Sequence, residues 1–90
     1  MRVAFEPEAL EDLDWWMDQD RKTGLKVLKL IREIQRNPFE GIGKPEPLKG
    51  DLSGWWSRRV NDERRLVCKV DGSGKDQWLI IAQCRGHYGD

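Results

Sequence analysis

The chain has 90 residues, of which 38% are hydrophobic and 36% are charged, and sixteen basic and sixteen acidic side chains give a net charge of zero. This length and composition predict a single globular domain, residues 1–90, with a heavily charged surface. No apolar run is long enough to span a membrane and the acidic N-terminus does not resemble a secretion signal, so we expect a cytoplasmic protein. Two cysteines without CxxC spacing and one histidine are too few ligands for zinc, so we expect no metal and no cofactor.

The neutral total conceals an uneven distribution of charge along the chain. Residues 1–20 hold seven acids and one base, whereas residues 21–36 hold six bases and one acid. A partner that carries phosphates responds to local basicity rather than to the total charge.

A short strand and a first helix are predicted at the start of the chain. Residues 2–5 favour a strand, which Pro7 ends, and proline is common in the first turn of a helix. We predict that this helix extends from Pro7 to about Arg21. Its predicted apolar stripe is formed by Leu10, Leu13 and Met17.

A second, basic helix is predicted next, with Asp20 or Thr23 as its N-cap. It should end at Asn37, because the following Pro38 disfavours helical backbone in the residue before it. The predicted apolar stripe comprises Val27, Leu30 or Ile31, and Ile34. The side chains expected to face outward are Lys26, Lys29, Arg32 and Arg36. The short turn between the helices predicts a helical hairpin.

A loop rich in glycine and proline follows, and three strand candidates complete the chain. These candidates span residues 55–61, 65–70 and 77–84, and the last contains the almost continuously apolar WLIIA, which is typical of a central strand. The order β-α-α-β-β-β predicts an α+β domain in which the hairpin covers one face of an antiparallel sheet. The opposite face is then available for a ligand.

Five tryptophans are many for this length. Trp15 and Trp16 are adjacent on the first helix, so one is expected in the core and the other at the surface or an interface. Trp55 and Trp56 should divide between the two faces of a strand, and Trp78 is expected in the core.

The loop and the C-terminal end carry side chains that suit chemistry on a phosphodiester. Glu46 lies between two prolines and could act as a general base, or be an ordinary exposed glutamate. His87 is a natural partner because its unperturbed pKa lies near neutrality, although a solvated histidine is equally consistent. Lys44 and Lys49 could hold phosphates, and Tyr88 could stack on a base or pack at the terminus.

Two pairs of adjacent arginines suggest a phosphate-binding surface. Neighbours in a strand lie on opposite faces, so one of Arg58 and Arg59, and one of Arg64 and Arg65, can face the ligand side. Guanidinium groups match phosphate oxygens and suit a pentacoordinate transition state. The alternative is that the other arginine of each pair forms salt bridges with nearby carboxylates.

Three stretches of the chain, in this order and at this spacing, carry a resemblance to a known family. They are NPFEGIGKPEPLKGDLSGWWSRRV (residues 37–60), ERRLV (63–67) and CRGHY (84–88). Together they resemble the YoeB group of the Txe/YoeB family, relatives of RelE in the RelE/ParE superfamily of toxins from type II toxin–antitoxin systems. The resemblance covers nearly the whole chain, and the RelE-like fold that it implies agrees with the predicted order of elements.

The resemblance implies a ribosome-dependent endoribonuclease, an mRNA interferase that inhibits translation by cutting messenger RNA in the A site of the 30S subunit without a metal. The 2′-hydroxyl attacks its own 3′-phosphate and leaves a 2′,3′-cyclic phosphate and a 5′-hydroxyl. Glu46 would be the general base and His87 the general acid, while Arg65 would stabilise developing charge and Tyr88 would orient the scissile nucleotide. The implied phosphate-binding residues are Lys49 and Arg59, with Lys44 as a further candidate.

The same resemblance implies a YefM/Phd-type antitoxin with a disordered acidic tail, and a homodimer. The chain departs from the family pattern at Gly86, where the family has an aromatic residue, and at Gly89 and Asp90, which continue past the usual end. These departures predict lowered activity. Two rivals follow: a toxin of this fold that acts by binding, for instance to gyrase, and an antitoxin-binding member that has lost catalysis.

Overall fold

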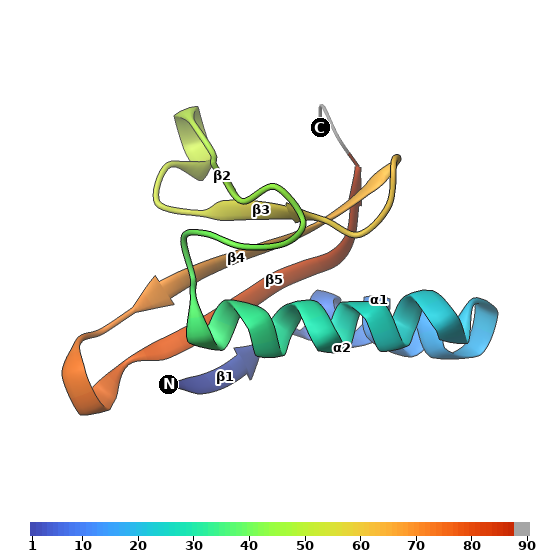
Figure 1. Ribbon diagram of the computed structural model, residues 1–90, viewed down its shortest axis with the longest axis horizontal. Coiled ribbons are helices and arrows are strands. Elements are labelled where there is room, and N and C mark those ends of the chain that lie inside the picture. Colours follow the sequence, from blue (N-terminus) through green and yellow to red (C-terminus); the bar gives the residue numbers. More distant parts are fainter. Residues whose placement is uncertain (88–90) are drawn as a thin grey trace.

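The computed structural model describes residues 1–87, in which two helices pack on one face of a five-stranded sheet (Figure 1). The predictions for Tyr88, Gly89 and Asp90 lie outside the described residues. The elements are β1 (Arg2–Phe5), α1 (Pro7–Gln19), α2 (Arg21–Arg36), β2 (Glu46–Pro47), β3 (Trp56–Arg59), β4 (Arg64–Asp71) and β5 (Trp78–His87). Two 3-10 turns lie at Gly50–Leu52 and Gly74–Asp76.

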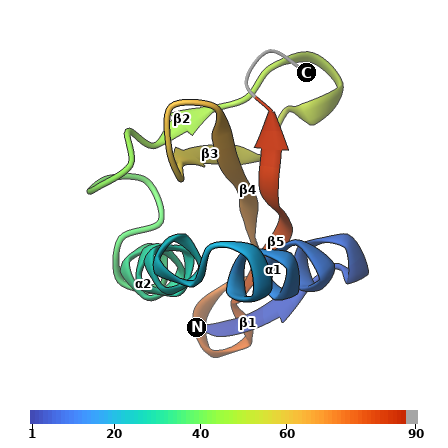
Figure 2. The same ribbon diagram turned by 90° about the vertical axis from the view of Figure 1, so that its right-hand side faces the viewer.

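The sheet has the strand order β1-β5-β4-β3-β2. The pairs from β5 to β2 are antiparallel as expected, but β1 lies parallel to β5, so the sheet is mixed rather than wholly antiparallel. The helical hairpin connects β1, at one edge of the sheet, to β2, at the other edge (Figure 2). Strand β5 lies between β1 and β4. The prediction that this strand is central is therefore confirmed.

The buried face of helix α1 matches the predicted apolar stripe only in part. Ala9 and Trp16 are buried and Leu13 packs partly against them, whereas Leu10 is 56% exposed, so its assignment to the apolar stripe was wrong. Residues at spacings of three and four share one helix face, and Leu10 lies one residue off that set. The adjacent Trp15 is exposed, so the expected division of the two tryptophans is confirmed.

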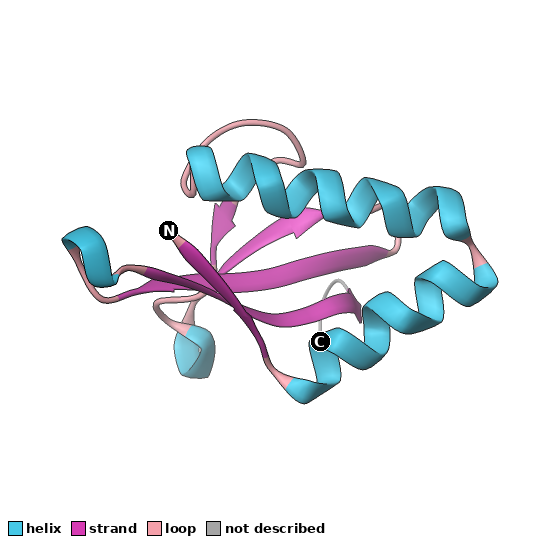
Figure 3. Cartoon of the chain, turned by 90° about the horizontal axis from the view of Figure 1, so that it is seen from below, coloured by secondary structure: helices cyan, strands magenta, loops and turns pink. Residues whose placement is uncertain are grey.

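Helix α2 follows its predicted pattern closely. The carboxylate of Asp20 caps it by accepting hydrogen bonds from the backbone N–H of Thr23 at 3.2 Å and from the Thr23 hydroxyl at 2.7 Å. The buried positions are Val27, Leu30, Ile31 and Ile34, as the stripe predicted, together with Gly24. Figure 3 shows α1 and α2 as an open V along the sheet. In the described residues no helix is long and apolar enough to cross a membrane.

The strands differ from prediction mainly at their ends. Strand β5 continues to His87, beyond the expected end at residue 84, and the two-residue strand β2 was not predicted. Trp78 is 36% exposed rather than in the core, because it occupies the first position of β5, where its ring lies 5.5 Å from the guanidinium carbon of Arg2. Trp56 faces the core and Trp55 faces the cavity described below.

Candidate active site

The sheet register brings three of the predicted site residues to one face. Glu46 pairs with Ser57, which pairs with Val67, and Arg59 pairs with Arg65. Residues directly opposite each other share a face, as do residues two apart in one strand. Glu46, Arg59 and Arg65 therefore lie on the face turned away from the hydrophobic core. From strand spacing and rise, the Cα atoms of Glu46 and Arg65 are about 12 Å apart, a distance that their long side chains and one phosphodiester group can bridge.

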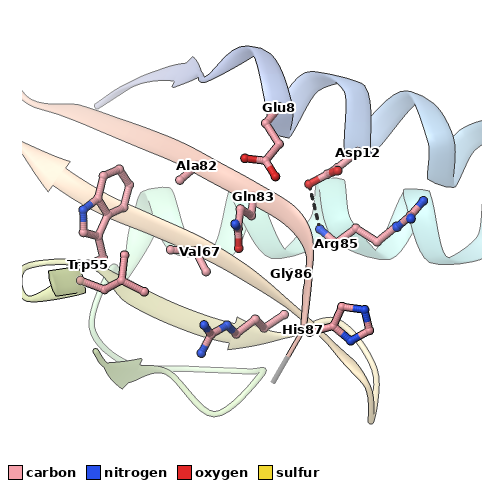
Figure 4. A pocket seen from close by; sticks show the side chains of 11 residues that line it. Glu8, Asp12, Trp55, Val67, Ala82, Gln83, Arg85, Gly86 and His87 are labelled. Carbon is pink, nitrogen blue, oxygen red and sulfur yellow. Dashed lines mark hydrogen bonds between the residues drawn. The ribbon is translucent and has the colours of Figure 1, made fainter. Parts of the chain in front are cut away.

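A cavity of about 500 Å³ adjoins this face. It lies between the first half of α1, the turn before β3, the first half of β4 and the end of β5 (Figure 4). Glu8 and Asp12 contribute carboxylates, Trp55 contributes an aromatic wall, and Arg65 and His87 come from the sheet. Arg65 is only 8% exposed. Cationic and aromatic groups beside an open volume can hold a nucleotide through its phosphate and its base.

The predicted acid does not point toward Arg65. Gly86 pairs with Arg65, whereas His87 pairs with Arg64, so His87 lies on the opposite face of the strand although it borders the cavity. Figure 4 shows its imidazole directed away from Trp55. A Cβ atom at Gly86 would overlap the Oε1 atom of Gln83 and lie 3.3 Å from the carbonyl oxygen of Arg65. Glycine at this position therefore keeps the cavity open next to Arg65.

The remaining predicted residues of the described chain lie outside the cavity wall. Glu46, Lys44, Lys49 and Arg59 are exposed, and none of them is part of the cavity wall. Lys44 has a φ of 49°, which is uncommon for a side-chain-bearing residue and marks a tight bend just before β2. The structure thus collects the four exposed side chains near one edge of the sheet and the Arg65–His87 region near the end of β5.

Arg58 lies on the opposite face from Arg59, as strand alternation predicted, but it binds backbone carbonyls rather than the carboxylates of the predicted salt bridges. It is 1% exposed and lies on the core face. Its Nη1 donates to the carbonyl of Ile42 at 2.9 Å, and its Nη2 donates to the carbonyls of Asn37 and Glu40. Burial lowers the pKa of the Arg58 guanidinium from its ordinary value. Arg58 therefore fastens the loop between α2 and β2 to strand β3.

The same loop is held to β3 through its backbone. The N–H of Arg59 donates to the carbonyl of Gly43 at 2.6 Å. Gly43 has a φ of 82°, and a Cβ there would come within 3.2 Å of both the Arg59 carbonyl and a Leu30 methyl group. Only glycine combines this backbone conformation with so close an approach. The segment that leads to Glu46 is consequently fixed on both sides.

Asp12 is a residue of the cavity that the sequence interpretation missed. Its Oδ2 atom accepts from the backbone N–H groups of Cys84 at 2.9 Å and Arg85 at 3.1 Å. Its spacing gives the signal that could have identified it: Asp12 lies three residues after Ala9 and four before Trp16, on the face of α1 that turns to the core. A carboxylate on that face requires a partner.

The two cysteines are buried and free. Burial raises the pKa of the Cys68 thiol to about 11. For Cys84 burial and, to a lesser degree, the nearby Asp12 carboxylate raise the pKa to about 12. Both thiols are neutral at physiological pH, so neither is suited to act as a nucleophile.

Comparison with known proteins identifies the family of this chain. The family model described as YoeB-like toxin of bacterial type II toxin–antitoxin system matches residues 5–88. Toxin YoeB of Mycobacterium bovis is 52% identical over 96% of each chain, and toxin YoeB of Escherichia coli K12 is 46% identical over 98% of this chain and 100% of its own.

Solved structures give the same result. The YoeB/ParE toxin from Agrobacterium tumefaciens superposes with a TM-score of 0.94 at 45% identity, covering 98% of this chain and 100% of that one. The Staphylococcus aureus YoeB dimer has a TM-score of 0.86 at 44% identity, with 98% of each chain covered. Escherichia coli YafQ, at a TM-score of 0.66 and 19% identity over 96% of this chain and 93% of its own, shares the fold. The chain belongs to the YoeB-like toxins of bacterial type II toxin–antitoxin systems.

Proposed function

We propose that this toxin is a ribosome-dependent endoribonuclease that cuts messenger RNA in the A site of the 30S subunit and so inhibits translation. Its place of action is then the cytoplasm, where ribosomes are. The observation that carries the proposal is the register that aligns Glu46, Arg59 and Arg65 on the face of the sheet turned away from the hydrophobic core. A carboxylate and two guanidinium groups on one face are the groups needed to deprotonate a hydroxyl and to stabilise a phosphorane-like transition state.

The proposed reaction is an internal transesterification. Glu46 removes the proton of a ribose 2′-hydroxyl, and the O2′ atom attacks the adjacent phosphorus. The bond from phosphorus to the 5′-oxygen of the next nucleotide breaks, and His87 protonates that oxygen. The products are a 2′,3′-cyclic phosphate and a 5′-hydroxyl, and no further reactant is needed. An ionised carboxylate and an imidazolium can coexist near neutral pH.

The cationic residues have separate parts in this proposal. Arg65 neutralises charge that builds up on the phosphate oxygens, and Arg59 and Lys49 hold the flanking phosphates, with Lys44 as a further contact. Tyr88 orients the scissile nucleotide. Because His87 pairs with Arg64 rather than Arg65, its imidazole must turn toward the phosphate when RNA binds. Apo geometries of catalytic groups commonly tighten in this way on substrate binding.

The test is cleavage of messenger RNA on purified ribosomes, with mapping of the new 5′ ends. We expect 5′-hydroxyl ends in the A-site codon with the unaltered chain, and a loss of at least about 100-fold with Glu46→Gln or His87→Gln. Glu40→Gln is a matched control, because Glu40 is an exposed glutamate of the same loop that contributes its backbone carbonyl, not its carboxylate, to Arg58. Full cleavage by Glu46→Gln would contradict the assigned base.

The same variants separate the rival functions. A toxin that acts by binding, for instance to gyrase, would still arrest growth after either substitution and would leave messenger RNA intact. A member that has lost catalysis would neither cleave nor arrest growth, but would still bind its antitoxin. Growth arrest that depends on both Glu46 and His87 supports the ribonuclease.

We also propose a YefM/Phd-type antitoxin and a homodimer as the partners of this chain. Support comes from Staphylococcus aureus, where a YoeB dimer and a heterotetrameric YoeB–YefM complex have been solved at 44% identity to this chain. The basic outer face of α2 offers Lys26, Lys29 and Arg32 to an acidic peptide. Light scattering should give twice the monomer mass, and co-expression with the YefM-type protein should yield a stable complex that no longer cleaves. A monomer at all concentrations would exclude the dimer.

A further inference from the structure

Strand β5 does not pair regularly with β4 near the cavity. The partners are Cys68 with Ile81, Val67 with Gln83, and Arg65 with Gly86. Between the first two of these pairs β5 advances by two residues and β4 by one, and between the last two β5 advances by three residues and β4 by two, so β5 contains one extra residue in each interval. The second irregularity forms a bulge at Cys84 and Arg85. Such a bulge removes backbone groups from the ladder, and these groups need other partners.

Side chains satisfy all four backbone groups of the two residues in this bulge. Asp12 accepts from the N–H groups of Cys84 and Arg85, the second of which is drawn in Figure 4. The indole Nε1 of Trp16 donates to the Cys84 carbonyl at 2.8 Å, and Nη1 of Arg64 donates to the Arg85 carbonyl at 3.1 Å. Asp12 is the only one of these side chains with a formal negative charge, and one of its oxygens holds both donors.

The bulge determines which side chain faces Arg65. If the register of Val67 with Gln83 continued without the extra residue, Arg65 would pair with Arg85. Two guanidinium groups would then lie opposite each other, which is unfavourable. With the bulge, Gly86 takes that position, and the Arg85 guanidinium lies 3.9 Å from the ring centroid of Trp15 instead. A slip of one residue would also reverse the face of His87.

We propose that Asp12 is a positioning residue, whose carboxylate holds the β5 bulge and thereby fixes Gly86 and His87 relative to Arg65. This inference rests on the ribonuclease function proposed above. Asp12 acts through the backbone of Cys84 and Arg85 and takes no part in proton transfer. Its charge suits the task, because hydrogen bonds from N–H groups to a carboxylate are about twice as strong as those to a neutral acceptor.

The first test measures the bulge without any RNA. Amide hydrogen exchange is followed by NMR in the unaltered chain, Asp12→Ala, Asp12→Asn and Asp14→Ala, an exposed aspartate of the same helix. In Asp12→Ala we expect the amides of Cys84 and Arg85 to exchange at least tenfold faster relative to Leu79, an amide of the same strand. Asp14→Ala should match the unaltered chain. Unchanged exchange at Cys84 and Arg85 in Asp12→Ala would overturn the proposal.

The second test measures single-turnover cleavage on programmed ribosomes. Misplacing reacting groups by about 1 Å can cost about 100-fold in rate, so we expect that loss in the Asp12→Ala rate constant, with ribosome affinity changed by less than about twofold. Asp12→Asn keeps an oxygen that can accept from both N–H groups, and should retain the rate within about tenfold. The core variant Ile34→Val, which is destabilised away from the cavity, should cleave at the full rate well below its melting temperature.

The outcomes distinguish this inference from the proposed function. Faster exchange in Asp12→Ala with undiminished cleavage would refute the positioning role and leave the ribonuclease standing. A comparable rate loss in Ile34→Val would show a general effect of instability and would also refute it. If the unaltered chain cleaves no RNA, the proposed function fails and the positioning role fails with it, while the exchange data still decide whether Asp12 holds the bulge.

Discussion

Replacing Arg58 by methionine should lower the free energy of unfolding of this protein more than the same replacement of any exposed arginine does. Met has a similar volume, but it cannot donate hydrogen bonds. Arg58→Met therefore removes three donated hydrogen bonds to the carbonyls of Asn37, Glu40 and Ile42 while leaving most of the buried volume filled. The loop between α2 and β2 loses its main attachment to β3.

The size of the effect follows from opposing contributions. Hydrogen bonds that involve a charged group contribute about 1.5–3 kcal/mol each, so three would sum to roughly 4.5–9 kcal/mol. Removing a buried charge recovers several kcal/mol of desolvation, and the three carbonyls belong to exposed residues, so water can reach the loop once it loosens. We expect a net loss of about 2–4 kcal/mol in the free energy of unfolding, a large part of the roughly 5–15 kcal/mol that holds a domain folded.

Urea denaturation followed by circular dichroism measures this loss directly, and Arg32→Met is the control. Arg32 is exposed on α2, and arginine and methionine have nearly equal helix propensities, so this control should change stability by less than about 0.5 kcal/mol. For a domain of this size Arg58→Met should lower Tm by about 10 °C or more. An Arg58→Met protein as stable as the control would refute the view that the guanidinium fastens the loop.

Three further predictions concern single sites. The hydrogen bonds of the cap lower the pKa of Asp20, so the stability that Asp20 contributes is present above its ordinary pKa of 3.8 and is lost as pH falls through the lower folded value. The difference in Tm between the unaltered chain and Asp20→Ala should therefore shrink below about pH 4. A difference that stays constant with pH would contradict the capping role of the carboxylate. Cys68 and Cys84, with pKa values raised to about 11 and about 12, should resist iodoacetamide at pH 8 in the native state and react once urea unfolds the chain, and rapid native labelling would contradict their burial. The loss of unfolding free energy caused by Gly86→Ala should be about 0.5–1 kcal/mol smaller in a Gln83→Ala background than in the unaltered chain, because the added Cβ overlaps the glutamine amide. Additive effects of the two substitutions in this double-mutant cycle would argue against that contact.

The parts of the fold that were predictable from the sequence depend on local patterns. The stripe from Val27 to Ile34, the cap at Asp20 and the end of α2 at Asn37 all involve residues within one or two helical turns of each other. The errors occurred where the position of a residue relative to the sheet determines whether its side chain is buried. Trp78 is apolar, but as the first residue of β5 it packs against Arg2 rather than in the core. Leu10 fitted a plausible spacing, yet Ala9 and Trp16 define the face that meets β5.

The candidate site was predictable as a set of residue types, and its arrangement was not. Alternation along a strand correctly indicated that Arg58 and Arg59 face opposite ways. It could not indicate that Arg58 binds carbonyls of a loop sixteen to twenty-one positions earlier. Nor could it reveal the two extra residues in β5, because a bulge depends on which partner strand is adjacent and leaves no periodic signal of its own. The register of His87 depends on that bulge.

Arg58 and Asp12 both bind backbone groups that have no partner in the sheet, and they do so with opposite charges. The loop near Glu46 presents carbonyl oxygens toward the core, which a buried cation can bind, and the bulge before His87 presents N–H groups, which an anion can bind. Both places lack the regular ladder that would otherwise pair these groups. The two substitutions should nevertheless differ in their effects. Arg58 is enclosed by the core, so its loss should appear chiefly as lost stability, whereas Asp12 borders the cavity, so its loss should appear chiefly as slower cleavage.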